Sequence, residues 1–437
     1  MGTSRKPKKD PEPIPTRHLS YSIHGSSGQN LASLDYQETF TSDCRPLITK
    51  SELLHHFTNV IAADLVWIDD LQNPWRQYIC PLASQSPGVL YAALSVAAAN
   101  LYFKFDPNSP HKTLSLNLMN EYRQKTVECL TPYLAFANCN DGRADSRTSS
   151  QAFQEALAIT LLLWHLEMHF PSDSLWRLHL RTAQALVYHY QKSSMLLLGS
   201  NRCGDFLISE FYCATIWPRL TLNVEIDDMT LNIPMADGTN AFVGFVQLMH
   251  QIIMKYRDCG GSDTIPAGNT MALTELESQA TKVRETVLTV EDTAKISLHN
   301  GASSDIAHVV DAWYYAVLLF GYRAIGRLDG SNPALQRARD CLFKSLLSFS
   351  SPLSFAQNQP WPLFIAGTEC AGNKKMQLWI ESRLLSLINF DCPLDRPRML
   401  DFLKEWWAQP SSTFDQKSCW MAFRKAPANF VKEFVIW

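Results

Sequence analysis

Paired cysteines are absent from the sequence: its eleven cysteines include no CxxC pair. Single, scattered cysteines in odd number favour reduced thiols over a disulfide framework, and this indicates an intracellular protein. Long apolar runs are also missing, because the longest nearly uncharged one, residues 91–103, is shorter than the roughly 20 residues of a membrane span. The basic N-terminus has no apolar stretch behind it, so we expect neither a signal peptide nor a membrane partner.

An excess of positive charge is lacking too, since the net charge is -3. This balance argues against a broadly basic nucleic-acid surface. The nucleotide-binding patterns GxGxxG and the P-loop, the nucleophile elbow GxSxG and the zinc motif HExxH do not occur. No motif therefore names a reaction, and we expect no cofactor.

What the chain does contain is enough apolar material for a large core: 46% of its residues are hydrophobic and 11% aromatic. Residues 1–45, which begin with a basic and proline-rich stretch, predict a disordered tail. Residues 46–437 predict a single helical domain. Ser4–Lys9 holds four basic residues, a pattern found in nuclear import signals and equally in solvated tails.

Helical spacing dominates this domain. One apolar stripe at three- and four-residue spacing predicts a long amphipathic helix, with members Leu273, Leu276, Ala280, Val283, Val287 and Val290. Asn332 followed by Pro333 predicts a capped helix start. Breakers at 138–147, 199–205, 258–269 and 297–305 predict loops. No alternating strand pattern occurs, so we predict an all-α fold of ten or more helices packed in antiparallel pairs.

The stretch WHLEMHF places His165 and His169 one helical turn apart, which raises the question of a metal site. Glu167 points roughly 200° away from His165 around the helix, so it does not join the pair easily. A third ligand from His179 or His189 needs the following helix to fold back. A pair of hydrogen-bonded, partly buried histidines is the favoured interpretation, and we expect no metal.

Four segments, taken in order, resemble the fungal-specific transcription factor domain, the helical region found C-terminal to binuclear zinc clusters in fungal regulators. The most specific of them are WRLHLRTAQALV and WPLFIAGTEC, and the resemblance extends from about residue 50 to the C-terminus. It implies a structural role at a helix junction for Trp176, Arg177, His179 and Arg181. Glu369, a charge inside the second segment, needs a partner, and we expect an arginine beside it.

The family's zinc cluster would need six cysteines in two CxxC halves, but Cys44 is the only cysteine before Cys80. We therefore expect no direct sequence-specific DNA reading by this chain. The first hypothesis is a regulator in the nucleus, or alternatively the cytoplasm. It would control a metabolic or secondary-metabolite gene set, such as a biosynthetic gene cluster, through other regulatory proteins or a small-molecule effector bound between helices. Homo-oligomerisation is left open.

The alternative hypothesis is an enzyme, in which the regulator scaffold is reused in fungal natural-product biosynthesis. A cyclisation or pericyclic reaction, such as a Diels–Alder reaction, needs neither metal nor nucleophile, only an apolar pocket with a few hydrogen-bond donors. The fold-level resemblance favours the regulator over the enzyme. Under either hypothesis the pocket candidates cluster around one helix hairpin: Trp164, His165, His169, Trp176, Arg177 and Tyr188.

Overall fold

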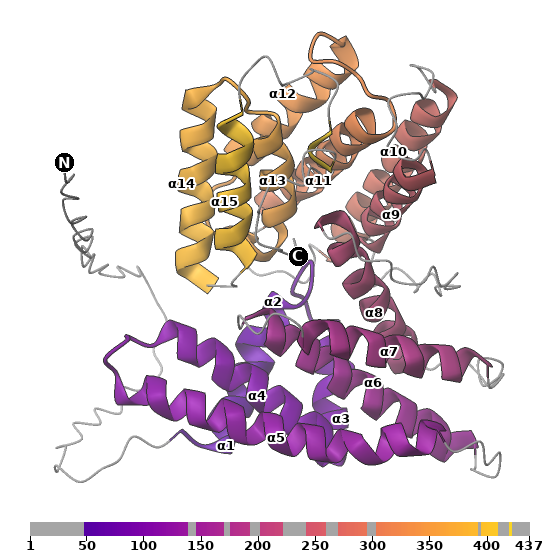
Figure 1. Cartoon of the computed structure of the whole chain (residues 1–437), viewed down its shortest axis with the longest axis vertical. Helices are drawn as coiled ribbons and strands as arrows, with labels where there is room; N and C mark the ends of the chain where they lie inside the picture. The colour runs from indigo at the N-terminus through magenta and orange to yellow at the C-terminus, as the bar shows by residue number, and fades with distance from the viewer. Residues whose placement is uncertain are drawn as a thin grey trace, which may run out of the picture. The chain divides into compact units, whose positions relative to one another are not determined.

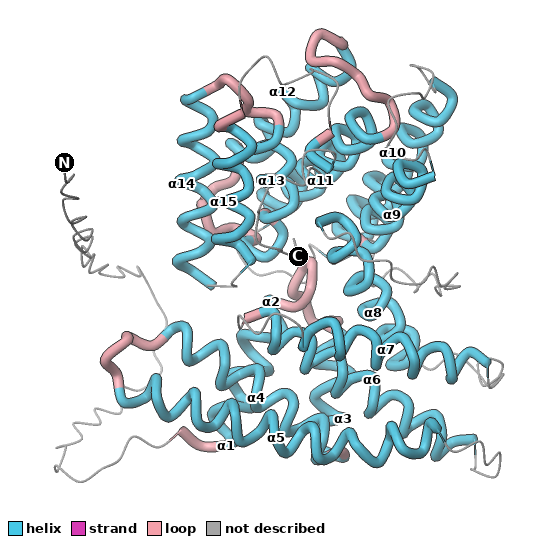
Figure 2. Tube along the Cα trace, viewed as in Figure 1, coloured by secondary structure: helices cyan, strands magenta, loops and turns pink. Residues whose placement is uncertain are grey.

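The computed structural model describes residues 48–138, 146–169, 175–192, 202–221, 242–258, 270–294, 303–391, 395–409 and 419–421. The predicted tail, residues 1–45, lies outside them. Everything described belongs to one compact unit, Pro46–Trp437. No strand occurs in the described part of the chain, and the all-α prediction is confirmed (Figure 2).

The helices follow one another along the chain with short helical turns between some of them (Figure 1). In order they are α1 (Lys50–His56), the π-helical turn η1 (Phe57–Ile61), α2 (Ala62–Asp64), the π-helical turn η2 (Trp75–Ile79), α3 (Cys80–Gln85), α4 (Pro87–Lys104), α5 (Pro110–Asn138), α6 (Ser146–Met168), α7 (Leu175–Lys192), α8 (Arg202–Thr221), α9 (Val243–Asp258), α10 (Thr270–Ala294), α11 (Ser303–Ala324), α12 (Pro333–Leu347), the 3-10 turn η4 (Ala356–Asn358), α13 (Pro360–Thr368), α14 (Lys374–Asp391) and α15 (Asp395–Trp407).

Consecutive helices pack against each other in pairs, as α4 does with α5, α6 with α7, and α11 with α12 (Figure 1). Helix α4 is the most enclosed: every side chain from Ala92 to Asn100 is buried. Its small alanines allow close approach of the neighbouring helices, and α4 also contacts α1, α3 and α6. The apolar character of α4 on all sides therefore reflects burial on all sides.

Local signals in the sequence set several helix ends. The Asn332 side chain accepts hydrogen bonds from the backbone N–H groups of Ala334 and Leu335, with Pro333 in the first turn, so this predicted cap is confirmed. Helix α10 buries Leu273, Leu276, Ala280 and Val287, as its stripe predicts. Two predicted breakers are shorter than expected, because α8 already begins at Arg202 and α11 at Ser303. Residues 139–145, 199–201, 259–269 and 297–302 lie outside the described residues.

The charge at Glu369 has the partner that the sequence predicts. Arg323 of α11 donates two hydrogen bonds to its carboxylate, from Nε to Oε1 at 2.8 Å and from Nη2 to Oε2 at 2.6 Å. Arg323 also donates from Nη1 to the carbonyl oxygen of Leu328. The Glu369 side chain is only 4% exposed, so the pair connects the end of α13 to α11 across the core.

Candidate ligand cavity

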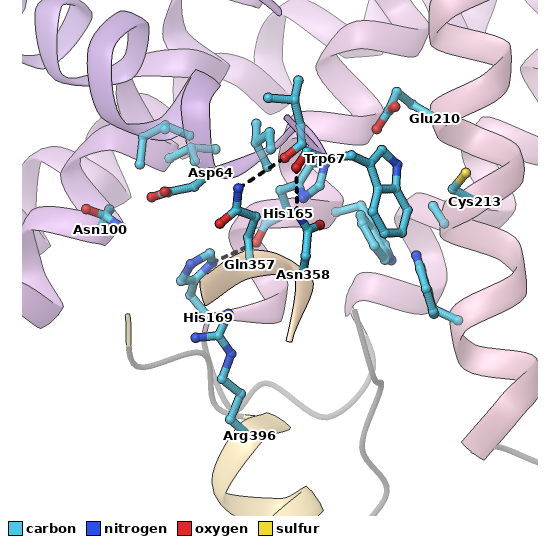
Figure 3. Close-up of a pocket in the computed structure, with 17 residues that line it drawn as sticks. Asp64, Trp67, Asn100, His165, His169, Glu210, Cys213, Gln357, Asn358 and Arg396 are labelled. Carbon is cyan, nitrogen blue, oxygen red and sulfur yellow. Dashed lines mark hydrogen bonds between the residues drawn. The ribbon is translucent and has the colours of Figure 1, made fainter. Parts of the chain in front are cut away.

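A cavity of about 110 Å³ lies among residues that are far apart in the sequence (Figure 3). Helices α2, α4, α6, α8 and α15, the segment after α2 and the turn η4 all contribute to its wall. A water molecule needs only about 10–15 Å³ by this measure, so the cavity has room for several waters or for a small organic molecule. Its lining consists of Ile61, Asp64, Leu65, Val66, Trp67, Val96, Asn100, Trp164, His165, His169, Glu210, Cys213, Ala214, Trp217, Gln357, Asn358 and Arg396.

The last turns of α6 supply one part of the wall, with Trp164, His165 and His169. His169 Nδ1 lies 2.9 Å from the carbonyl oxygen of His165 and donates to it, so in the neutral ring Nε2 is the acceptor. His165 packs edge-on against the rings of Trp75 and Trp164. Burial lowers the pKa of His165 to about 3, with a smaller contribution from His169, so His165 is uncharged at neutral pH.

Helix α8 supplies a second part of the wall. Glu210, Cys213 and Trp217 stand at three- and four-residue spacing and therefore lie on one face of the helix. Burial alone raises the pKa of Glu210 to about 8, and burial is also the main cause of the raised pKa of the Cys213 thiol. Glu210 is half-buried and lines the cavity. No described residue forms a hydrogen bond or an ion pair with its carboxyl group.

The segment after α2 is anchored to η4 by a set of aromatic and backbone contacts. The Trp67 ring stacks on Phe242 at 4.9 Å and meets Trp313 edge-on at 4.7 Å. Trp313 Nε1 donates to the carbonyl oxygen of Asn358 at 2.8 Å, and Asn358 Nδ2 donates to the carbonyl oxygen of Trp67 at 2.5 Å (Figure 3). These contacts hold Trp67 and Asn358 in the wall of the cavity.

A strained residue precedes this turn. Phe355 has φ 51°, in the left-handed region, which costs a bulky residue about 1–3 kcal/mol. The Gln359 side chain fixes the turn by donating to the carbonyl oxygens of Pro352 and Ser354, and it accepts a hydrogen bond from Arg383. Strain of this kind persists only where surrounding contacts over-determine the backbone, and it is common beside functional sites.

Arg396, in the first turn of α15, is the cationic member of the lining. Its side chain is 7% exposed, and Nη1 donates to the carbonyl oxygen of Leu387 at 3.3 Å. Asn100 Oδ1 of α4 accepts a hydrogen bond from His56 Nε2 at 2.9 Å, which orients its amide. The wall thus combines indole and aliphatic surfaces with a small number of polar groups, as ligand pockets in proteins commonly do.

Of the residues that the sequence suggests for a pocket, the fold brings Trp164, His165 and His169 together at the cavity. The other three lie on α7, away from the lining. The guanidinium group of Arg177 lies over the Trp176 ring at 4.5 Å, Trp176 packs against the core, and Tyr188 is 53% exposed. Sequence reasoning overlooked Glu210, although a charge within the apolar run FLISEFYCATIW is the same signal that pointed to the pairing of Glu369.

The hairpin of α6 and α7 gives Glu167 a different role from the two histidines beside it. Glu167 forms an ion pair with Arg123 of α5 and lies 4.0 Å from His179 Nε2 of α7. Burial lowers the pKa of His179 to about 4, with a further contribution from the charge of Arg123. His189 is exposed on α7. Within the described ranges, no group of three or more His, Cys, Asp or Glu side chains is placed to hold a metal ion.

The family model described as the fungal specific transcription factor domain matches residues 52–426. The chain belongs to this family. The match begins within α1, extends past α15 and includes every helix that lines the cavity, so the cavity lies within the fungal transcription factor domain itself. No curated protein and no solved structure matches the chain. In the part of the chain that the structure describes, no helix is both long and apolar enough to cross a bilayer.

Proposed function

We propose that this protein is a nuclear transcription regulator whose helical domain senses a small molecule in the cavity between α2, α4, α6, α8 and α15. The observation that carries the proposal is the mostly apolar cavity inside a fungal transcription factor domain. A ligand there touches segments from three distant parts of the chain. It therefore changes the relative populations of two packings of the helices, provided that it binds them with different affinity.

The output of such a sensor is a set of transcripts. We propose a metabolic or secondary-metabolite gene set, controlled together with another regulatory protein that the helical surface contacts. Effector binding between helices is a suitable input for this control, because the difference in effector affinity between two helix packings determines how far the equilibrium between them shifts.

Deletion of the gene tests the proposal. In the fungus that carries it, transcripts of the neighbouring genes and the accumulated metabolites are measured in the same cultures, with a strain re-expressing the wild-type chain as control. We expect several transcripts to fall together and to recover on re-expression. Unchanged transcripts with one accumulating metabolite would contradict regulation.

A second candidate, a cofactor-free cyclase, is favoured by one observation. A carboxyl group with its pKa raised to about 8, such as that of Glu210, is protonated at neutral pH inside an apolar cavity. Such a group is suited to donate a proton to a carbonyl oxygen during a cyclisation. The accumulated metabolite of the deletion experiment would then be the substrate, and its conversion by the purified chain would be lost in the Glu210→Gln variant.

A further inference from the structure

We infer that the cavity binds a flat, uncharged, conjugated carbonyl compound, whose carbonyl oxygen accepts a hydrogen bond from the carboxyl group of Glu210. The inference rests on the proposed function, because it names the chemical class of the effector. Three observations support it: the indole rings in the wall, the uncharged state of the wall's central groups, and the unpartnered hydrogen-bond capacity of Glu210.

The shape of the ligand follows from the aromatic wall. Trp67, Trp164 and Trp217 come from three different elements and all border the cavity. The Trp67 and Trp217 rings are neighbours, with centroids 6.4 Å apart and planes tilted by 42°. Indole surfaces contribute most when a flat, polarisable ring system stacks on them or meets them edge-on. A planar conjugated ligand therefore gains more here than a branched aliphatic one of equal size.

The charge of the ligand follows from the ionisable groups in the wall. At neutral pH His165, Glu210 and Cys213 are uncharged, because burial disfavours their ionised forms. Arg396 directs Nη1 at the carbonyl oxygen of Leu387. An ionised ligand would lose its hydration in such a site without a dedicated counter-ion from α6 or α8, which is costly.

Glu210 supplies the directional contact. Figure 3 shows its carboxyl group turned away from α8 toward the interior of the cavity, on the side of Trp67 and His165. A protonated carboxyl group carries one O–H donor, and a buried donor needs an acceptor. No described residue supplies one. A carbonyl oxygen, an uncharged acceptor common in planar conjugated molecules, meets this need.

The affinity then depends on pH through Glu210. The titratable or charged side chains that share the wall with Glu210 are Asp64 of α2, His165 and His169 of α6, Cys213 of α8 and Arg396 of α15. Helices α7 and α9 also pack against α8. His179 of α7 lies beside Glu167, and His250 of α9 contacts Tyr212 and Arg219. At about pH 9, a carboxyl group with pKa about 8 is protonated in about a tenth of the molecules.

The test is a calorimetric titration of the full-length chain with 2-acetylnaphthalene, a flat uncharged ketone. Binding is compared at about pH 6.5 and about pH 9, and with 2-naphthoate, an anion of nearly the same size. We expect the wild-type chain to bind the ketone about tenfold more tightly at the lower pH. We expect naphthoate to bind more weakly than the ketone at both.

Two variants assign the effect to Glu210. Glu210→Gln keeps a donor that does not titrate, so we expect equal ketone affinity at both pH values. Glu210→Met removes the donor, so we expect weaker binding at both pH values and a carbonyl stretching frequency of the bound, carbon-13-labelled ketone above that in wild type. The matched control is Glu285→Gln, at an exposed position on α10, which should behave as wild type. Circular dichroism verifies that each variant is folded.

Three results would overturn the inference: no saturable binding of the ketone, naphthoate binding as tight as ketone binding, or a wild-type affinity that does not change with pH. None of these outcomes alters the transcript response to gene deletion, which tests the proposed function separately. Conversely, unchanged transcripts after deletion would contradict the proposed regulatory function without affecting the measured ligand binding.

Discussion

Two carboxyl groups inside apolar stretches of the sequence have opposite surroundings in the fold. Glu369 is held by two hydrogen bonds from Arg323. Glu210 has no such cation beside it, and burial raises its pKa to about 8. The same sequence signal, a charge among apolar residues, thus corresponds to a structural ion pair in one case and to a cavity-lining proton donor in the other.

The Arg323–Glu369 pair allows a direct test of its structural role. Glu369→Leu leaves the buried Arg323 guanidinium without its carboxylate, and we expect the free energy of unfolding to fall by about 3 kcal/mol or more. The double variant Arg323→Met, Glu369→Leu removes both charges, so we expect it to be more stable than the single variant. Urea unfolding followed by circular dichroism measures both. Equal losses in the single and double variants would contradict the unpaired guanidinium of Arg323 as the cause of the loss.

The partner of Glu369 was predictable because a buried carboxylate nearly always needs a cation or several donors. The role of Glu210 was not predictable from the same signal. Its environment depends on Trp67, Asn358 and Arg396, which are more than a hundred residues away from it along the chain. Only the arrangement of α2, η4, α8 and α15 around the cavity decides whether such a carboxyl group meets a cation or a cavity.

At the scale of elements, close approach of helices is fixed by small residues. Gly88 begins α4, where it meets both α5 and α6: a Cβ at this position would lie 3.0 Å from Cys129 Cβ and 2.6 Å from Ile159 Cδ1. Cys129 Cβ is attached to the backbone and has little freedom to move. The α4 helix therefore depends on a glycine for its contact with two neighbours.

Gly88→Ala should lower the free energy of unfolding by about 1–3 kcal/mol through overpacking. The intrinsic helix preference of alanine over glycine, about 1 kcal/mol, acts in the opposite direction. The matched control is Gly330→Ala, because no atom lies within 4 Å of a Cβ at Gly330. We expect this control to change stability by about 0.5 kcal/mol or less. Thermal unfolding that gives equal values for both variants would contradict close packing at α4.

Helix existence was predictable from sequence, and helix ends were predictable only where a cap is explicit. Asn332 and Pro333 mark the start of α12, and the structure has it there. Glycine-containing stretches were less informative: Cys203 and Gly204 lie inside α8, although the local composition predicts a loop. The reason is that every residue of α8 from Phe206 onward except Glu210 is buried, and tertiary contacts extend a helix beyond what local propensity indicates.

At the scale of the whole molecule, stability should depend on pH with a maximum. Burial lowers the pKa of His165 to about 3 and of His179 to about 4, from 6.5 in the unfolded chain. Below pH 6.5 the unfolded state therefore binds up to two more protons than the folded state, and stability is lost as pH falls. Glu210 acts oppositely: its pKa rises from 4.5 to about 8, so the folded state keeps a proton that the unfolded state loses, and stability is lost as pH rises toward 8.

Between pH 4.5 and 6.5 the effect of the two histidines on stability is larger than the opposite effect of Glu210. Above pH 6.5 only the effect of Glu210 remains. We therefore predict maximal stability near pH 6.5 and a fall of about 1 kcal/mol per pH unit on either side. Urea unfolding across this range measures it. In Glu210→Gln the decrease in the free energy of unfolding between pH 6.5 and 8 should disappear, while the decrease below pH 6.5 remains. An unchanged fall in stability above pH 6.5 in this variant would contradict the assignment of that fall to Glu210.

The cavity is a property of the whole domain, and this limits what the sequence alone predicts of it. His165 and His169 were identified from their spacing on one helix, whereas Gln357 and Asn358 reach the same wall only because Trp313 and Trp67 hold η4 beside the segment after α2. A ligand in this position contacts α6, α8 and η4 together. The proposed sensing of a small molecule therefore requires the intact cavity wall and Glu210 within it.

The most direct measurement of this claim is transcript profiling of a strain in which the chromosomal gene carries only Glu210→Met, beside strains carrying Glu285→Gln and the deletion. Immunoblotting confirms equal protein levels in the two substituted strains. We predict that the transcripts lost on deletion also change in the Glu210→Met strain and stay at wild-type levels in the Glu285→Gln strain. A Glu210→Met strain with wild-type levels of every transcript that depends on the gene would contradict regulation through the cavity.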